Sequence, residues 1–223
     1  MITNRLHSIL DMVEDKTIAD IGCDHAYIPI RLALDKRITK AIACDKNKGP
    51  LEIAKNNVRR YDLQDIIELR LGEGLSALSP GETETIIIAG MGGVLIGDII
   101  EENIEIAKAS TLILQPMNSQ YELRKRLKSL GFSIISEELS SEGFKVYNLM
   151  KVKWGENSEE TDDIYYHIPK SLLSHPLCPM LIAKKRREFT KILRGYEKSE
   201  QEFDTQKYKK LLSELNELEG ELI

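Results

Sequence analysis

The feature that most constrains the fold is an alternation, between residues 17 and 152, of short β-branched runs with longer amphipathic segments. This pattern is typical of parallel strands joined by crossover helices. The sequence therefore predicts an α/β fold with a doubly wound, Rossmann-like sheet. The predicted strands are Thr17–Ile21, Ala41–Asp45, Ile66–Leu71, Thr85–Ala89 and Thr111–Gln115, and the predicted helices are Thr3–Val13, Tyr27–Leu34, Pro50–Arg60, Val94–Ile106 and Ser119–Ser129.

The pattern changes after the fifth strand. Two further strand runs, Phe132–Glu138 and Lys145–Val152, are separated by turn residues 140–143. They predict an antiparallel hairpin at one edge of the sheet. Dinucleotide-binding sheets rarely end this way, whereas methyltransferases of this fold do. By this analogy we expect a seven-stranded methyltransferase sheet with an antiparallel last strand.

The last third of the chain differs from the alternating region. The acidic and polar segment Gly155–Asp163 predicts a linker, and the apolar residues beyond it recur at helical spacing. They form two stripes, which predict an antiparallel, coiled-coil-like helical hairpin joined near Asp204. We therefore divide the chain into a cofactor-binding domain, 1–155, and a linker with a helical tail, 156–223. The stripes are Ile182, Phe189, Ile192, Leu193 and Tyr196, then Tyr208, Leu211, Leu215, Leu218 and Leu222.

Composition excludes several classes of protein. No run approaches the ~20 apolar residues of a membrane span, and no signal-peptide pattern opens the chain, so we expect a cytoplasmic protein without a membrane partner. Cys23, Cys44 and Cys178 are widely spaced, which argues against disulfides and against a metal site. The net charge of −5 means that any nucleic acid must meet a locally basic face. A monomer is the favoured state.

The loop after the first strand carries the first candidate site. Asp20 precedes a tight turn, Gly22 to Ala26, that leads into a helix. The turn lets backbone N–H groups approach a polar ligand, and Asp20 can accept hydrogen bonds from an ammonium group. A G-x-G-x-x-G fingerprint is absent, because Asp24 and Tyr27 replace its second and third glycines. An amino-acid moiety therefore fits this turn better than a pyrophosphate.

Three more loops at the carboxyl ends of strands should meet at the same edge of the sheet. Asp45 and Lys46 follow the second strand, where a carboxylate can take ribose hydroxyls or, alternatively, cap a helix. Gly72–Gly74 follows the third strand and can approach an adenine ring or form an ordinary turn. Gly90-Met91-Gly92-Gly93 follows the fourth strand. Many amino-group methyltransferases have an Asn/Asp-Pro-Pro-aromatic loop at this place, and its absence argues against an exocyclic amine as the target.

Taken together, three motifs closely resemble those of the bacterial tRNA (adenine(22)-N1)-methyltransferases, a class I S-adenosylmethionine-dependent family. They are residues 20–29, residues 89–93 and residues 112–116, and the resemblance runs the whole length of the chain. Cys23 and Met117 depart from the residues that are commoner in that family. The resemblance implies S-adenosylmethionine as cofactor, S-adenosylhomocysteine as product, and tRNA as substrate. It assigns cofactor binding to Asp20, Gly22, Cys23, His25, Ala26, Asp45, Lys46, Gly72, Glu73, Gly74, Gly90, Met91 and Gly92.

The same resemblance implies methyl transfer to N1 of an adenine. Methylation leaves a positive charge on the base, and Asp24 is the candidate carboxylate that stabilises it. His25 and Tyr27 are candidates to hydrogen-bond or stack on the base. The alternatives are that Asp24 or His25 caps the following helix and that Tyr27 packs in the core. Substrate contacts are assigned to Gly93, Gln115 and Pro116.

The most basic stretch is Lys184-Lys185-Arg186-Arg187, for which phosphate contact and a solvated charged surface are competing explanations. Two other functions also stay open. One is methylation of another RNA, a protein or a small molecule by the same fold. The other is a non-catalytic protein that binds the cofactor or RNA.

Overall fold

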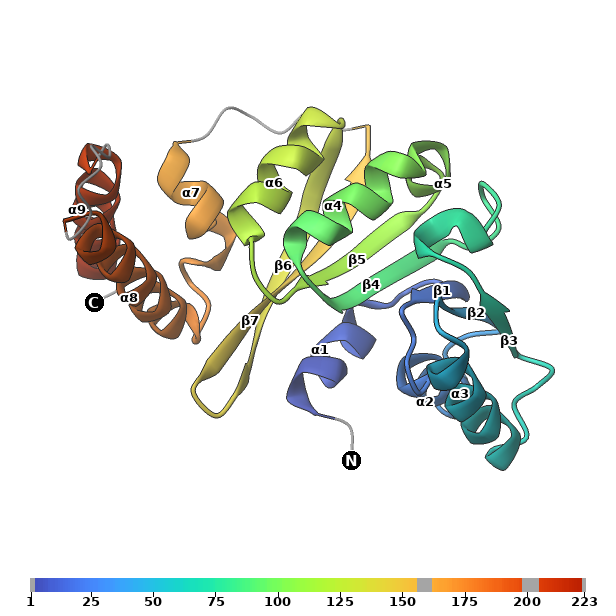
Figure 1. Ribbon diagram of the computed structural model, residues 1–223. Coiled ribbons are helices and arrows are strands. Elements are labelled where there is room, and N and C mark those ends of the chain that lie inside the picture. Colours follow the sequence, from blue (N-terminus) through green and yellow to red (C-terminus); the bar gives the residue numbers. More distant parts are fainter. Residues whose placement is uncertain (1–2, 156–161, 198–204, 222–223) are drawn as a thin grey trace.

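The computed structural model describes residues 3–155, 162–197 and 205–221. A seven-stranded sheet forms its centre, in the order β3-β2-β1-β4-β5-β7-β6 (Figure 1). The first five strands run parallel, and β7 pairs antiparallel with both β5 and β6, which confirms the predicted sheet. The strands are β1 (Thr17–Ile21), β2 (Lys40–Asp45), β3 (Ile67–Leu71), β4 (Thr85–Met91), β5 (Thr111–Pro116), β6 (Phe132–Glu142) and β7 (Lys145–Trp154).

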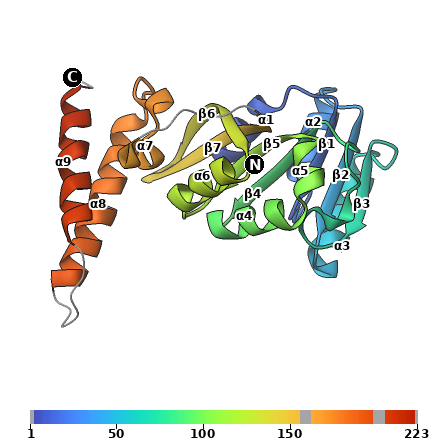
Figure 2. The same ribbon diagram turned by 90° about the horizontal axis from the view of Figure 1, so that it is seen from above.

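Helices cover both faces of the sheet, so the fold is doubly wound (Figures 1 and 2). One buried cluster joins a sheet face to α1 (Asn4–Met12), α2 (Tyr27–Leu34) and α3 (Lys48–Arg60). A second cluster joins the other face to the 3₁₀ helix η1 (Gly74–Ala77), α4 (Gly93–Glu102), α5 (Ile104–Lys108) and α6 (Gln120–Ser129). The strand order reverses between β1 and β4, and ligands of open α/β sheets bind at such a switch point.

Two local predictions were wrong. The segment expected to be one helix, Val94–Ile106, is interrupted at Asn103, whose side chain donates to the carbonyl of Ile99 at 3.4 Å. Asparagine side chains compete with the helix in this way. The hairpin turn comprises only Gly143 and Phe144, because Glu142 pairs with Lys145. Gly143 has a φ of 58°, as the first turn position of a tight hairpin requires.

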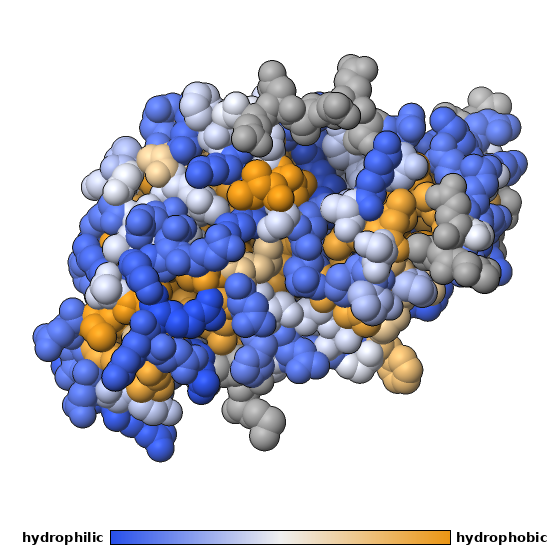
Figure 3. All heavy atoms as spheres, turned by 180° about the vertical axis from the view of Figure 1, so that it is seen from behind, coloured by the Kyte–Doolittle hydropathy of each residue, from blue (hydrophilic) through white to orange (hydrophobic). Residues whose placement is uncertain are grey.

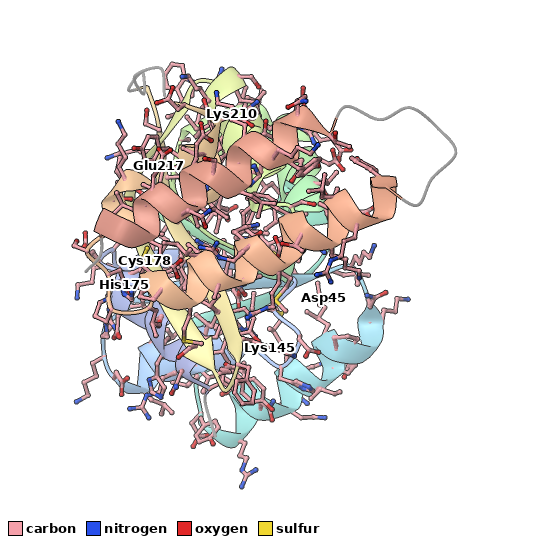
Figure 4. All side chains as sticks on the ribbon, turned by 90° about the vertical axis from the view of Figure 1, so that its left-hand side faces the viewer. Asp45, Lys145, His175, Cys178, Lys210 and Glu217 are labelled. Atoms are coloured by element: carbon pink, nitrogen blue, oxygen red, sulfur yellow. The ribbon has the colours of Figure 1, made fainter. Side chains whose placement is uncertain are left out.

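The tail is helical, as predicted, and contains α8 (Cys178–Glu197) and α9 (Gln206–Glu221). Glu217, late in α9, lies at the same end of the pair as Cys178, so the two helices run antiparallel (Figure 4). The short α7 (Asp163–His167) and the 3₁₀ helix η2 (Lys170–Leu172) precede them and were not predicted. The predicted connection at Asp204 and the stripe residue Leu222 lie outside the described residues.

A third buried cluster fixes the tail to the sheet. It joins apolar residues of the tail to Leu139 and Val146 of the β6–β7 hairpin. His175, just before α8, contacts Glu138 of β6 at 2.5 Å. The hairpin therefore belongs to the sheet and also supports the tail.

The surface of the molecule is mostly polar. On the face seen in Figure 3, apolar side chains reach the surface in several separate areas among hydrophilic residues, as is usual for folded proteins. None of the described helices is both long and apolar enough to cross a membrane. The three cysteines are buried and unpaired.

Candidate active site

The loops at the carboxyl ends of β1, β2, β3 and β4 border one cavity of about 470 Å³. The structure thus brings together seven of the predicted cofactor residues: Gly22, Asp45, Lys46, Gly72, Glu73, Gly74 and Met91. Asp98 and Glu102 of α4 complete an acidic lining that sequence analysis missed, because only the packing of α4 places them there. An acidic cavity suits a cationic ligand with ribose hydroxyls.

The turn after β1 depends on unusual backbone conformations. Gly22, Asp24 and Ala26 all have positive φ, of 71°, 48° and 58°. The N–H groups of Gly22 and Cys23 both donate to the carbonyl of Cys44 on the neighbouring strand, at 2.8 and 2.9 Å. A Cβ on Gly22 would lie 2.3 Å from the terminal methyl of Met91. Gly22 is therefore required by its left-handed conformation, whereas the flexible end of Met91 could move aside.

Asp20 is a buried carboxylate next to this turn. It is 4% exposed, and within the described ranges no group donates a hydrogen bond to it. Burial, with a smaller contribution from the charge of Asp45, raises the pKa of Asp20 to about 7. A buried carboxylate without a donor is costly unless a ligand supplies one. Asp20 thus meets the requirement for holding an ammonium group.

Because the N-cap of α3 is Asn47, the alternative of a helix cap is wrong for Asp45. Its Oδ1 accepts a hydrogen bond from the N–H of Asn47 at 2.8 Å, just before α3. The other carboxylate oxygen makes no bond within the described residues and can accept from a ribose. Beside it, Lys46 Nζ and Glu73 Oε1 lie 3.5 Å apart at the cavity rim.

The glycines after β3 also pack tightly. A Cβ on Gly72 would lie 2.7 Å from Ala77 Cβ, and Gly74 has a φ of 56° with Ile99 at 3.2 Å. These contacts explain the two glycines by the packing of η1. They do not test the predicted contact with adenine. Both glycines line the cavity, which supports that prediction.

The three predicted catalytic residues lie together outside the cavity lining. The side chain of Asp24 is 66% exposed, and its Oδ2 lies 3.4 Å from Nε2 of His25. The rings of His25 and Tyr27 are 5.2 Å apart. The N-cap of α2 is Ala26, without a side-chain cap, and Tyr27 is 51% exposed. The structure thus contradicts the alternatives in which Asp24 or His25 caps α2 and Tyr27 packs in the core.

Gln115 is less accessible than predicted for a substrate contact. It is fully buried, and its Oε1 accepts hydrogen bonds from Arg5 Nη1 at 2.7 Å and from the N–H of Gly90 at 3.2 Å. Its Nε2 donates to the carbonyl of Pro116. Because its amide already makes these hydrogen bonds, Gln115 holds the loops after β4 and β5 in place and is not accessible to a substrate. Arg5, from α1, was missed by sequence analysis, since nothing in its sequence neighbourhood points to this site.

The basic stretch of α8 is divided between different surroundings. Lys185 is 6% exposed and pairs with Glu188 at 2.8 Å, and Arg186 bonds Asn216 and Glu219 of α9. Lys184 is partly buried, and only Arg187 of the four is exposed. The four residues therefore do not form the single basic patch that their adjacency suggested. Lys191 and Arg194 are exposed with Arg187 along α8.

Gly93, predicted to contact substrate, is buried where α4 begins. Gly93→Ala is expected to lower the free energy of unfolding by about 1–3 kcal/mol through overpacking. The added Cβ would lie 2.4 Å from the carbonyl oxygen of Ser119, a backbone atom that cannot turn away. Urea denaturation measures the change. Gly49→Ala is the control, since a Cβ there meets nothing within 4 Å. Equal free energies of unfolding for the two variants would contradict the expected overpacking at Gly93.

Comparisons with known proteins agree with this geometry. A family model described as a methyltransferase domain matches residues 2–150. The tRNA (adenine(22)-N(1))-methyltransferase of Bacillus subtilis is 31% identical over 225 residues, covering 96% of this chain and 92% of the relative.

Solved structures cover the whole fold. The Bacillus subtilis m1A22 tRNA methyltransferase superposes with a TM-score of 0.82 at 27% identity, over 100% of this chain and 99% of that chain. A candidate tRNA (m1A22) methyltransferase from Streptococcus pneumoniae, solved in complex with S-adenosyl-L-methionine, gives a TM-score of 0.85 at 31% identity, over 98% and 99% of the two chains. The sheet, the tail and the sequence thus agree: this chain belongs to the bacterial tRNA (adenine(22)-N1)-methyltransferase family.

Proposed function

We propose that this protein transfers the methyl group of S-adenosylmethionine to N1 of adenine 22 in tRNA. The observation that carries the proposal is the acidic cavity at the switch point of the sheet, beside the buried carboxylate of Asp20, to which no described residue donates a hydrogen bond. Membership of the family supports the choice of cofactor, base and tRNA. tRNA as substrate in turn supports a cytoplasmic location.

The residues present fit the cofactor. Asp20 would accept hydrogen bonds from the ammonium of its methionine moiety, and the free oxygen of Asp45 would accept them from the ribose. The turn at Gly22 would let the backbone approach the methionine moiety, and the place of Gly72 and Gly74 in the cavity lining supports a contact with the adenine ring. When bound, S-adenosylmethionine supplies an electrophilic methyl group on a sulfonium.

The chemistry at the base needs few protein groups. Adenine N1 has an in-plane lone pair that would attack the methyl carbon once base pairing is broken and the atoms are in line. The C–S bond would break as the N–C bond forms, and neutral S-adenosylhomocysteine would leave, so positioning carries most of the catalysis. The partly buried ring of His25 and the exposed ring of Tyr27 offer a surface for stacking the base. Asp24 is the carboxylate that stabilises the cationic product and accepts its N6 proton.

Selective methylation of tRNA tests the proposed function. With an unmodified transcript, one methyl group is expected on A22, located by the block that it causes to reverse transcription. The same transcript with G22 is the matched control and should accept none. Methylation elsewhere would contradict the assigned base, and methylation only of a small molecule or protein would favour that alternative. Cofactor binding without any turnover would favour a non-catalytic protein.

We propose that the exposed basic residues of α8 contact tRNA phosphates, with the protein acting as a monomer. Replacing Arg187, Lys191 and Arg194 together with alanine is expected to raise the KM for tRNA. Since each phosphate contact releases about one counterion, the dependence of log KM on log salt should flatten by about two to three. Steady-state kinetics across a salt series measure both effects, and the affinity for S-adenosylmethionine should not change. Wild-type kinetics at every salt concentration would instead make these residues a solvated charged surface.

A further inference from the structure

A second cavity, of about 330 Å³, lies between the methyltransferase sheet and the tail. The loop after β5 and the start of α6 form one wall, from Met117 to Glu122. Lys184, Lys185 and Phe189 of α8 and Lys207 of α9 lie opposite. This cavity does not share a lining residue with the cofactor cavity. It is therefore a separate site built by both parts of the chain.

The wall of this junction cavity is continuous with the loops that carry Gly93 and Pro116, two of the predicted substrate contacts. The N–H of Met117 donates to the carbonyl of Met91 at 2.8 Å, and the N–H of Gly93 donates to that of Asn118 at 3.1 Å. Met91 itself lines the cofactor cavity. The loops that follow β4 and β5 thus connect the linings of the two cavities. A polymer whose reacting base lies at the Gly90–Gly93 loop can place its next residue in the junction cavity.

The charge in the junction cavity favours an anion. Lys185 pairs with Glu188, and Lys207 with Asp163, but no carboxylate among the described residues lies within ion-pair distance of Lys184. Lys184 Nζ has only the carbonyl of Val146, at 3.4 Å, and burial lowers the pKa of its ammonium. A partly buried cation without a counterion is costly in the free protein. A ligand phosphate would offset that cost.

Aromatic rings line the same cavity. Tyr121 stacks on His167 with ring centres 4.4 Å apart, and Phe189 meets the other residues of this group edge-on or tilted, at 4.8 Å from His167 and 5.9 Å from Tyr208. Both ring nitrogens of His167 are buried without a partner within the described residues. Rings beside a cationic group are the combination by which proteins hold single-stranded nucleotides.

We propose that the junction cavity holds the nucleotide adjacent to the methylated adenosine of tRNA, with Lys184 contacting its phosphate. This inference rests on the proposed function, since it needs an RNA strand at the Gly90–Gly93 loop. It gives the tail a second role. Besides attracting tRNA through the exposed side of α8, the tail positions the strand beside the reacting base.

The test combines a protein variant with a modified RNA. Lys184→Met removes the charge and keeps the length of the side chain. Because it removes an unpaired, desolvated cation, the variant should fold at least as stably as wild type. We expect kcat/KM for tRNA to fall about tenfold, the scale of one hydrogen bond to a charged group, with unchanged affinity for S-adenosylmethionine. Lys108→Met, at the opposite edge of the sheet just before β5, is the matched control.

Methylphosphonate substitution then locates the phosphate. tRNAs are assembled with one uncharged methylphosphonate at each phosphate flanking A22 in turn. For wild type, kcat/KM should fall about tenfold when one of these phosphates is replaced. For Lys184→Met, replacing the same phosphate should lower kcat/KM no further, so the two changes are non-additive. Independent, additive effects at every flanking phosphate would overturn the inference. The same comparison with Lys184→Gln, whose side chain is polar but uncharged, should give the same non-additive result. If wild type does not methylate A22 at all, the proposed function has failed rather than the cavity assignment.

Discussion

Asp24→Asn is expected to lower the single-turnover rate of tRNA methylation by about 10²–10³-fold, the range for loss of one group that stabilises charge in the transition state. The substitution keeps the shape of the side chain and removes its charge. Asparagine tolerates the left-handed φ of 48° found at this position, so the turn should be retained. Since Asp24 does not line the cofactor cavity, the affinity for S-adenosylmethionine should stay close to that of wild type.

Asp62→Asn is the matched control for this prediction. Asp62 also has a positive φ, of 54°, but follows α3 at the opposite edge of the sheet, so its substitution should leave turnover unchanged. Calorimetric titration separates the remaining explanation. If Asp24 instead holds the sulfonium, the variant would lose affinity for S-adenosylmethionine but not for the neutral S-adenosylhomocysteine. Near-normal turnover in Asp24→Asn would remove this residue from the catalytic set.

Asp20→Asn is expected to weaken the binding of S-adenosylmethionine by about 10²-fold, because hydrogen bonds between the ammonium and a charged acceptor contribute about 1.5–3 kcal/mol. In wild type the affinity should fall as the pH is lowered through about 7, since protonation of Asp20 removes the charge that the ligand needs. The variant should show no such dependence. Titration calorimetry between pH 6 and 8 measures both results, and an unchanged affinity would exclude Asp20 from the site.

The same substitution should stabilise the ligand-free protein. The pKa of Asp20 is about 7 in the folded state and 3.8 in its ordinary range, so the folded state binds more protons between these values. The contribution of Asp20 to the free energy of unfolding therefore falls as the pH rises from about 4 to 7, and it stays low above 7. Asp20→Asn avoids this loss. Its gain in stability should be absent near pH 4 and largest at pH 8, whereas Asp62→Asn should show none. A pH-independent difference would contradict the buried, charged state of Asp20.

Sequence alone determined the features that depend on local signals. β-branched runs of strand length define the five parallel strands, and the short connection between the last two runs allows only an antiparallel hairpin. Because parallel strands end at one edge, the loops beginning at Gly22, Asp45, Gly72 and Gly90 had to meet there. The fold and the cofactor cavity could be predicted for this reason, and the resemblance of the motifs supplied the family.

Other features were decided only by tertiary contacts. Arg5 reaches Gln115 across 110 positions of sequence, and that contact makes Gln115 a support of the loops. Tertiary contacts also give neighbouring residues of α8 different surroundings. Lys184 and Lys185 line the junction cavity, while Arg187 is exposed to solvent. In a helix, adjacent residues point about 100° apart, so the packing of α8 against α9 and β7 assigns each residue its surroundings. Sequence carries the periodicity of these elements, but burial, ion pairing and the junction cavity arise only when distant elements pack together.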